Sequence, residues 1–189
     1  MSHLVFLPAT EPGDDTYGLA PEHVTAYPEI SVHQVSFPSL VWYNQAVQSE
    51  AVAQIRDLSN GPVILVGFSK SGLGAWNIAR TIPDLVQATI IFDAPVAREQ
   101  LPPWETAAFY DSDESWRKDL PIRLVEEFQS AMPANHSLVL ISGKGFHDEM
   151  CALSQAASDI ELDHVFLSRP HQTHNWQSGW IDEGLAAIL

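Results

Sequence analysis

The chain has 189 residues, of which 46% are hydrophobic, and this length and composition are typical of one globular domain with a buried core. Its 9 basic and 24 acidic residues give a net charge of −15, which argues against nucleic acid or an anionic membrane as a partner, because both attract basic patches. No apolar run approaches the length of a membrane span, and the first residues lack the pattern of a signal peptide. The one cysteine, Cys151, excludes an internal disulfide, so we expect a cytoplasmic protein.

The first third of the chain predicts two strands and a helix. Residues 4–7 form a short apolar run, typical of a buried strand, which Pro8 ends. Residues 30–37 alternate weakly between apolar and polar side chains and predict a second, more exposed strand. Residues 43–58 place apolar side chains on one side of a helix, and Asn60 and Gly61 follow as its stop signal.

The next segment, residues 62–80, passes from a strand to a helix with almost no residues between them. The run 63–66 is β-branched and aliphatic, as in a strand buried on both faces, and helical periodicity is visible from Ala75 onward. A turn this tight strains the backbone at Ser69 and lifts its hydroxyl off the end of the sheet. The residues two positions before and after Ser69 must be small, and Gly67 and Ser71 meet this requirement.

Residues 88–92 predict the next strand, and the segment that follows it is the least regular part of the chain. Residues 94–136 hold five prolines and one predicted helix, from Pro121 to Ala131. The acidic run 111–114 is most simply a solvated turn. We interpret 94–136 as a cap-like excursion from a single domain that spans residues 1–189.

The last part of the chain returns to regular alternation. Residues 138–142 and 162–167 predict strands, and residues 148–157 and 176–189 predict helices. Strands that alternate with helices indicate a parallel sheet, because parallel neighbours need a crossover connection. The sequence therefore predicts an α/β fold with a mostly parallel, doubly wound sheet of about six strands.

The strand, tight turn and helix around Ser69 resemble the nucleophile elbow of the α/β-hydrolase family, whose usual form is Gly-x-Ser-x-Gly. Here the second glycine is Ser71, which gives the looser form with a small residue at that place. The resemblance covers nearly the whole chain, although the first two strands of larger family members are absent. It implies that Ser69 is a catalytic nucleophile.

The family's catalytic acid and histidine follow the nucleophile in chain order. The resemblance implies Asp148 as the acid, on the loop after the second strand beyond the elbow, with Asp93 as the alternative. It implies His174 as the base, because His174-Asn175-Trp176 resembles the His-x-Trp ending of many small esterases. His171, on the same loop, is expected to line the substrate pocket or simply to be solvated.

Two backbone N–H groups are needed to stabilise the oxyanion of an acyl-transfer reaction. The resemblance implies Lys70, the residue after the nucleophile, as one donor. The other implied donor is on the loop after the first strand, where Pro8 cannot donate an N–H. We therefore expect Thr10 to be the second donor, with Ala9 as the alternative.

The expected activity is hydrolysis of a small carboxylic ester through an acyl-enzyme, with no cofactor and no metal. Trp104, Trp116 and His171 are the candidate substrate-binding residues. The alternatives are a thioesterase or acyltransferase with the same site, or a non-catalytic binding or scaffolding module on this fold. The family's strand order would leave the strand at residues 30–37 at an exposed edge, where it could pair in a homodimer.

Overall fold

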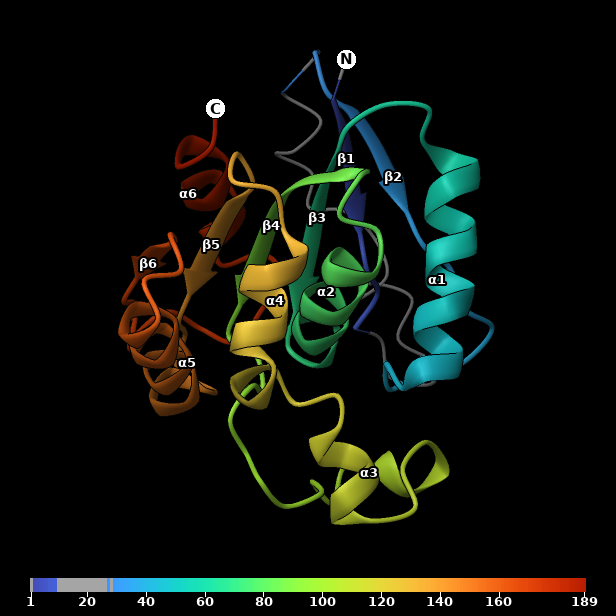
Figure 1. Ribbon diagram of the computed structural model, residues 1–189, viewed down its shortest axis with the longest axis vertical. Coiled ribbons are helices and arrows are strands. Elements are labelled where there is room, and N and C mark those ends of the chain that lie inside the picture. Colours follow the sequence, from blue (N-terminus) through green and yellow to red (C-terminus); the bar gives the residue numbers. More distant parts are fainter. Residues whose placement is uncertain (1, 10–26, 28) are drawn as a thin grey trace.

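The structure is a computed structural model that describes residues 2–9, 27 and 29–189, and the strands of these residues form one six-stranded sheet. All neighbouring strands are parallel, in the order β2-β1-β3-β4-β5-β6. The strands are β1 (His3–Phe6), β2 (Ser31–Gln34), β3 (Val63–Phe68), β4 (Val86–Phe92), β5 (Ser137–Ile141) and β6 (Val165–Leu167). The predicted parallel α/β sheet is confirmed, and β2 lies at one of its edges (Figure 1).

Helices cover both faces of the sheet and bury an apolar layer on each. The helices are α1 (Gln45–Leu58), α2 (Lys70–Thr81), α3 (Asp113–Arg117), α4 (Val125–Ala131), α5 (His147–Asp159) and α6 (Trp180–Ala186), with 3-10 turns η2 (Thr106–Ala108) and η3 (Pro121–Arg123). One core layer joins the sheet to α1, α2, α4 and α5, and the other joins it to α6. None of the helices described combines the length and the apolar character needed to cross a bilayer.

Several elements differ in extent from those predicted. Helix α2 begins at Lys70 and not at Ala75, because its first turn is buried on all sides and shows no polar face. The acidic run 111–114 opens a short helix and is not only a solvated turn, since Ser112 forms a capping box with Ser115. The last helix is shorter than predicted and covers Trp180–Ala186.

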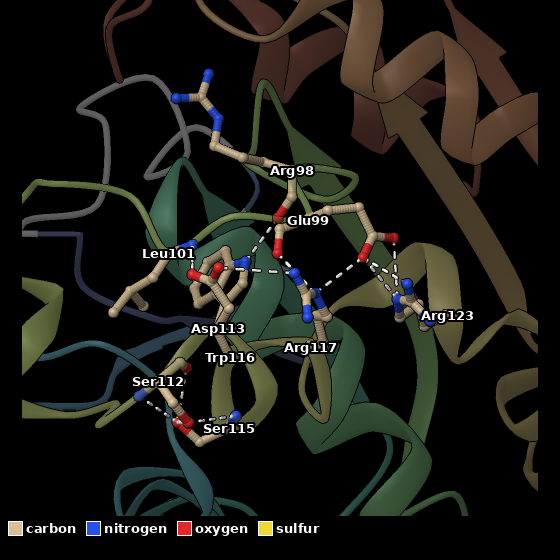
Figure 2. Close-up of polar contacts among 9 residues, drawn as sticks. All are labelled: Arg98, Glu99, Leu101, Ser112, Asp113, Ser115, Trp116, Arg117 and Arg123. Atoms are coloured by element: carbon tan, nitrogen blue, oxygen red, sulfur yellow. Dashed lines mark hydrogen bonds and ion pairs between the residues drawn. The ribbon is translucent and has the colours of Figure 1, made fainter.

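The segment between β4 and β5 extends past the carboxyl ends of the strands, where α3 and its loops project from the body of the protein (Figure 1). Figure 2 shows the ion pairs that Glu99 forms within this segment. Its carboxylate lies 3.2 Å from the guanidinium of Arg117 and 2.6 Å from that of Arg123. All three side chains are substantially exposed, so these ion pairs add little to stability at ordinary ionic strength.

Trp116 is the main apolar anchor of the same segment. Its side chain is fully buried, and its indole N–H donates a 2.6 Å hydrogen bond to the carbonyl of Arg98 (Figure 2). A fully buried ring has no surface to offer a ligand. The expectation that Trp116 binds substrate is therefore wrong, and this residue instead fixes the backbone from which Arg98 projects.

His136, which precedes β5, makes folding stability sensitive to acid. Its Nε2 atom lies 3.0 Å from the hydroxyl of Thr89 in β4, and burial lowers its pKa to about 4. An unfolded histidine takes up a proton near pH 6.5, so between about pH 6.5 and 4 protonation favours the unfolded chain. We expect this histidine alone to remove about 2 kcal/mol of unfolding free energy between pH 7 and 4.5.

Urea unfolding of the wild type and of His136→Gln over that pH range measures this effect. The free energy of unfolding of the variant should fall less steeply with acidification, because the other titrating groups are common to both proteins and cancel in the difference. Parallel curves for the two proteins would contradict the assignment.

Candidate active site

The turn that follows β3 holds Ser69 in a strained conformation. Ser69 has φ 52° and ψ −128°, a region that L-residues rarely occupy, and α2 begins at the next residue. A Cβ atom on Gly67 would lie 2.3 Å from the carbonyl oxygen of Ser71, so only glycine fits at that position. The tight strand-to-helix turn expected from the sequence is present, and it places Ser69 at the carboxyl end of the sheet.

Ser71, which replaces the usual second glycine, closes this turn with its hydroxyl group. Its Oγ accepts a 2.9 Å hydrogen bond from the backbone N–H of Phe68 and lies 2.9 Å from the carbonyl oxygen of Phe68, to which it donates. The side chain is fully buried. The departure from glycine therefore adds two hydrogen bonds across the elbow without blocking it.

His174 reaches Ser69 from the loop between β6 and α6. Its Nε2 atom lies 3.2 Å from the hydroxyl oxygen of Ser69. The imidazole packs against the ring of Phe68, with a centroid separation of 4.5 Å, and Trp176 packs against the same ring at 5.2 Å. Trp176 is buried, so the His-x-Trp sequence anchors the loop two residues beyond the histidine and orients it.

Asp93 completes the row of side chains. Its carboxylate lies 2.7 Å from Nδ1 of His174, and the side chain is fully buried. Asp93 directly follows β4, the neighbour of the strand that carries Ser69, and has φ 44°. Ser69, His174 and Asp93 thus form a connected hydrogen-bonded series.

The loop that was expected to supply the acid instead binds the carboxylate of Asp93. The backbone N–H groups of Gly143, Gly145 and Phe146 donate hydrogen bonds of 2.9, 2.9 and 2.7 Å to it. A Cβ atom on Gly143 would lie 2.5 Å from this carboxylate, and one on Gly145 would lie 2.7 Å from Nδ1 of His174. Both glycines are needed for the loop to wrap so closely.

The structure therefore corrects the assignment of Asp148 as the acid. Asp148 lies in the first turn of α5 and is exposed, whereas Asp93 contacts His174. The alternative acid considered for the sequence is the one that the geometry supports. The two glycines at 143 and 145 were the available signal, because they mark close backbone approach to another group.

Asp93 is held as a carboxylate despite its burial. Burial raises its pKa, but the hydrogen bonds from His174, Phe146 and Gly145 and the charge of a protonated imidazole lower it, and the net pKa lies below the ordinary aspartate value. An ionised Asp93 accepts a hydrogen bond from Nδ1–H of His174, which leaves Nε2 free of hydrogen and able to accept the proton of Ser69.

A cleft of about 770 Å³ opens over this series at the carboxyl ends of the strands. Trp104 lines it, as the sequence suggested, together with residues that sequence reasoning missed, namely Leu40, Trp42, Arg98, Glu105 and Phe146. These residues come from loops far apart in the sequence and carry no local motif. His171 is exposed and does not line the cleft, so its expected place in the substrate pocket is wrong.

The structure describes Lys70 and Ala9 among the expected oxyanion donors. Lys70 is the first residue of α2, so its backbone N–H belongs to a helix N-terminus, where negative charge is favoured. Thr10, the expected second donor, lies outside the described residues. Ala9, the alternative, is buried shortly after the end of β1.

Within the described part of the chain, no group of three or more potential ligand side chains could hold a metal ion.

Comparison with solved structures extends over nearly the whole chain. MPT51 of Mycobacterium tuberculosis is similar with a TM-score of 0.72 and 13% identity, covering 99% of this chain and 90% of that one. An S-formylglutathione hydrolase of Agrobacterium tumefaciens has a TM-score of 0.66 and 16% identity, covering 98% and 82%. Est1E of Butyrivibrio proteoclasticus has a TM-score of 0.59 and 12% identity, covering 99% and 85%.

These likenesses, together with the sheet order and the elbow, identify the class of the protein: it has the α/β-hydrolase fold. The similar structures include esterases and hydrolases. No protein-family model matches the chain, and no curated protein matches it in sequence. At 12–16% identity the solved structures define the fold, and the chemistry has to be argued from the site.

Proposed function

We propose that this protein is a serine hydrolase that cleaves a small carboxylic ester through an acyl-enzyme. The observation that carries the proposal is the series Ser69–His174–Asp93, with contacts of 3.2 and 2.7 Å, whose first two members line a cleft. The nucleophile is on a strained elbow, the base is within reach of it, and a buried carboxylate orients the base. Each role follows from the position of the side chain and not from its place in the sequence.

In the first step, Oγ of Ser69 attacks the carbonyl carbon of the ester while Nε2 of His174 takes the hydroxyl proton. The tetrahedral oxyanion receives hydrogen bonds from the backbone N–H of Lys70 and from a second donor on the loop after β1. Collapse of this intermediate breaks the bond to the alcohol, which leaves with the proton from His174. Asp93 remains ionised and stabilises the imidazolium.

In the second step, His174 removes a proton from water as the water attacks the acyl-enzyme. The second tetrahedral intermediate releases the carboxylic acid and returns the proton to Ser69. Neither step requires a metal or an organic cofactor. A thioester or an acyl acceptor other than water would use the same residues, so the leaving group and the acceptor have to be found by experiment.

A panel of p-nitrophenyl esters of graded acyl length, from acetate to octanoate, tests the proposal. We expect turnover with a clear maximum at one length, and no loss of rate when EDTA is added. A parallel assay with acyl thioesters and p-nitroanilides separates esterase from thioesterase and amidase activity. No turnover of any substrate by a folded protein, judged from near-UV circular dichroism, would contradict the proposal and favour a binding module.

A further inference from the structure

A continuous row of aromatic rings leads along the cleft to the histidine of the site. The rings of Trp42 and Trp104 are stacked, with centroids 6.4 Å apart and an interplanar angle of 17°. Trp104 meets Phe146 edge to face at 5.7 Å, and Phe146 meets His174 edge to face at 5.4 Å. The row therefore runs from the imidazole of His174 through Phe146 and Trp104 to Trp42.

Trp104 is the exposed member of this row. Its relative exposure is 41%, whereas Trp42 is buried and Phe146 is half-buried. Among the described residues, four large hydrophobic side chains are exposed, and Trp104 is the aromatic one. An exposed indole inside a cleft that also holds a nucleophile indicates a binding surface, because leaving such a ring in water forgoes the free energy of burying it.

Trp104 is nevertheless held in a fixed place. Its backbone carbonyl accepts a 2.9 Å hydrogen bond from the indole N–H of Trp42. The guanidinium of Arg98 lies 4.8 Å from the centre of the Trp104 ring, and Arg98 is itself paired with Glu149 at 3.2 Å. The ring is thus ordered before a ligand arrives, which lowers the entropic cost of binding.

The charges around the cleft do not favour an ion. Arg98 is neutralised by Glu149, and the remaining charged lining residues, Lys70 and Glu105, are of opposite sign. The ammonium of Lys70 is directed over the ring of Trp42, 5.7 Å from its centre. Beside these polar groups, the cleft offers a ligand the exposed part of the Trp104 ring and the half-buried ring of Phe146.

We propose that the ester carries an uncharged aromatic ring a few bonds from its reacting carbonyl, and that Trp104 is the residue that selects for this ring. The inference rests on the proposed serine hydrolase activity and narrows its substrate class. Two aromatic rings attract each other through their charge distributions, in addition to the free energy gained from burial. A saturated ring of the same size lacks this electrostatic attraction. The size of the preference, about 2- to 10-fold, follows from that difference.

Two matched pairs of esters measure the preference. The methyl esters of 3-phenylpropionate and 3-cyclohexylpropionate have the same leaving group, which carries no ring, and the same spacing from ring to carbonyl, so their intrinsic reactivities match. The acetates of 2-phenylethanol and 2-cyclohexylethanol test the alcohol side in the same way. We expect kcat/KM to favour the aromatic member by about 2- to 10-fold in at least one pair, although the cyclohexyl group is the more hydrophobic.

Substitution of Trp104 then separates selectivity from general damage. Trp104→Leu should bring the ratio for the preferred pair to about one or below, mainly through KM, while Trp104→Phe should keep part of the preference. Leu58→Ala, at an exposed residue at the end of α1, is the control and should leave the ratio unchanged. If Trp104→Leu does not fold, the ratios measured with the wild type and with Trp104→Phe still test the aromatic preference.

The two proposals fail in distinguishable ways. Hydrolysis that depends on Ser69 but shows no aromatic preference in either pair would overturn the aromatic inference and leave the hydrolase proposal standing. If no ester is hydrolysed, calorimetric titration with 3-phenylpropan-1-ol and 3-cyclohexylpropan-1-ol tests the ring selectivity alone. Tighter binding of the aromatic alcohol, lost in Trp104→Leu, would support it, and equal binding would overturn it.

Discussion

Replacement of Asp93 by asparagine is expected to lower kcat for ester hydrolysis by about 10⁴-fold, whereas Asp148→Asn should leave it nearly unchanged. One carboxylate oxygen of Asp93 accepts from Gly145 and His174, and the other accepts from Gly143 and Phe146. Asparagine keeps one acceptor and turns the other into a donor. An amide donor facing His174 would place the imidazole proton on Nε2, where it blocks transfer from Ser69.

The comparison of the two asparagine variants decides which acid acts. Asp148 is a matched control, because it is the same residue type and is exposed in the first turn of α5. In the sequence it closely follows the loop whose N–H groups bind Asp93. Steady-state kinetics with the best p-nitrophenyl ester gives kcat and KM for both variants, and near-UV circular dichroism reports on folding. A large loss in Asp148→Asn with a small one in Asp93→Asn would restore the assignment that the sequence alone favoured.

Asp93→Asn should also destabilise the fold at neutral pH. The pKa of Asp93 lies below the ordinary value, so the folded protein favours the carboxylate over the neutral acid. This contribution is present above the pKa of the unfolded aspartate and is lost as the pH falls through the lower folded value. The variant has no such contribution, so its stability difference from the wild type should shrink in acid.

Ser69→Ala is expected to have the largest effect on catalysis, a loss of about 10⁶-fold in kcat. The hydroxyl is the only group removed, and within the described residues it contacts the imidazole of His174. The backbone of the elbow is fixed by other groups, namely Gly67 and the hydroxyl of Ser71. The variant should therefore fold normally while losing its nucleophile.

Covalent labelling with a fluorophosphonate probe gives this prediction a second readout. The wild type should be labelled at Ser69, and Ser69→Ala should not be labelled. Asp148→Asn, which changes an exposed side chain in the first turn of α5, is the control and should keep its labelling. A wild-type protein that resists the probe would favour the binding module, and labelling of Ser69→Ala at an equal rate would identify another nucleophile.

Patterns local to the chain were sufficient to predict the sheet and two members, Ser69 and His174, of the hydrogen-bonded series. The apolar run at 63–66, the small residues around Ser69 and the alternation of strands with helices all operate over a few residues. A strand buried on both faces, a short turn and a helical period can each be recognised from a few consecutive residues. His174 was identified from the family's His-x-Trp ending, and the packing of Trp176 against Phe68 gives that short pattern its physical meaning.

The acid could not be chosen in this way, and neither could the lining of the cleft. Asp93 and Asp148 each follow a strand of the sheet, and both are acidic residues in polar surroundings along the chain. The choice depends on which backbone N–H groups converge on which carboxylate, and Gly143, Gly145 and Phe146 converge on Asp93 from a loop about 50 residues away.

The two tryptophans of the irregular segment show the same limit. Trp104 and Trp116 both lie in the segment without regular periodicity, yet Trp104 is 41% exposed in the cleft and Trp116 is fully buried. A side chain in a loop without regular structure takes its surroundings from distant elements and not from its own periodicity. The sequence alone thus determined the sheet and singled out Ser69 and His174, the proposed nucleophile and base. The tertiary structure decided which carboxylate contacts His174 and which rings line the cleft, because those depend on contacts between loops that only the folded sheet brings together.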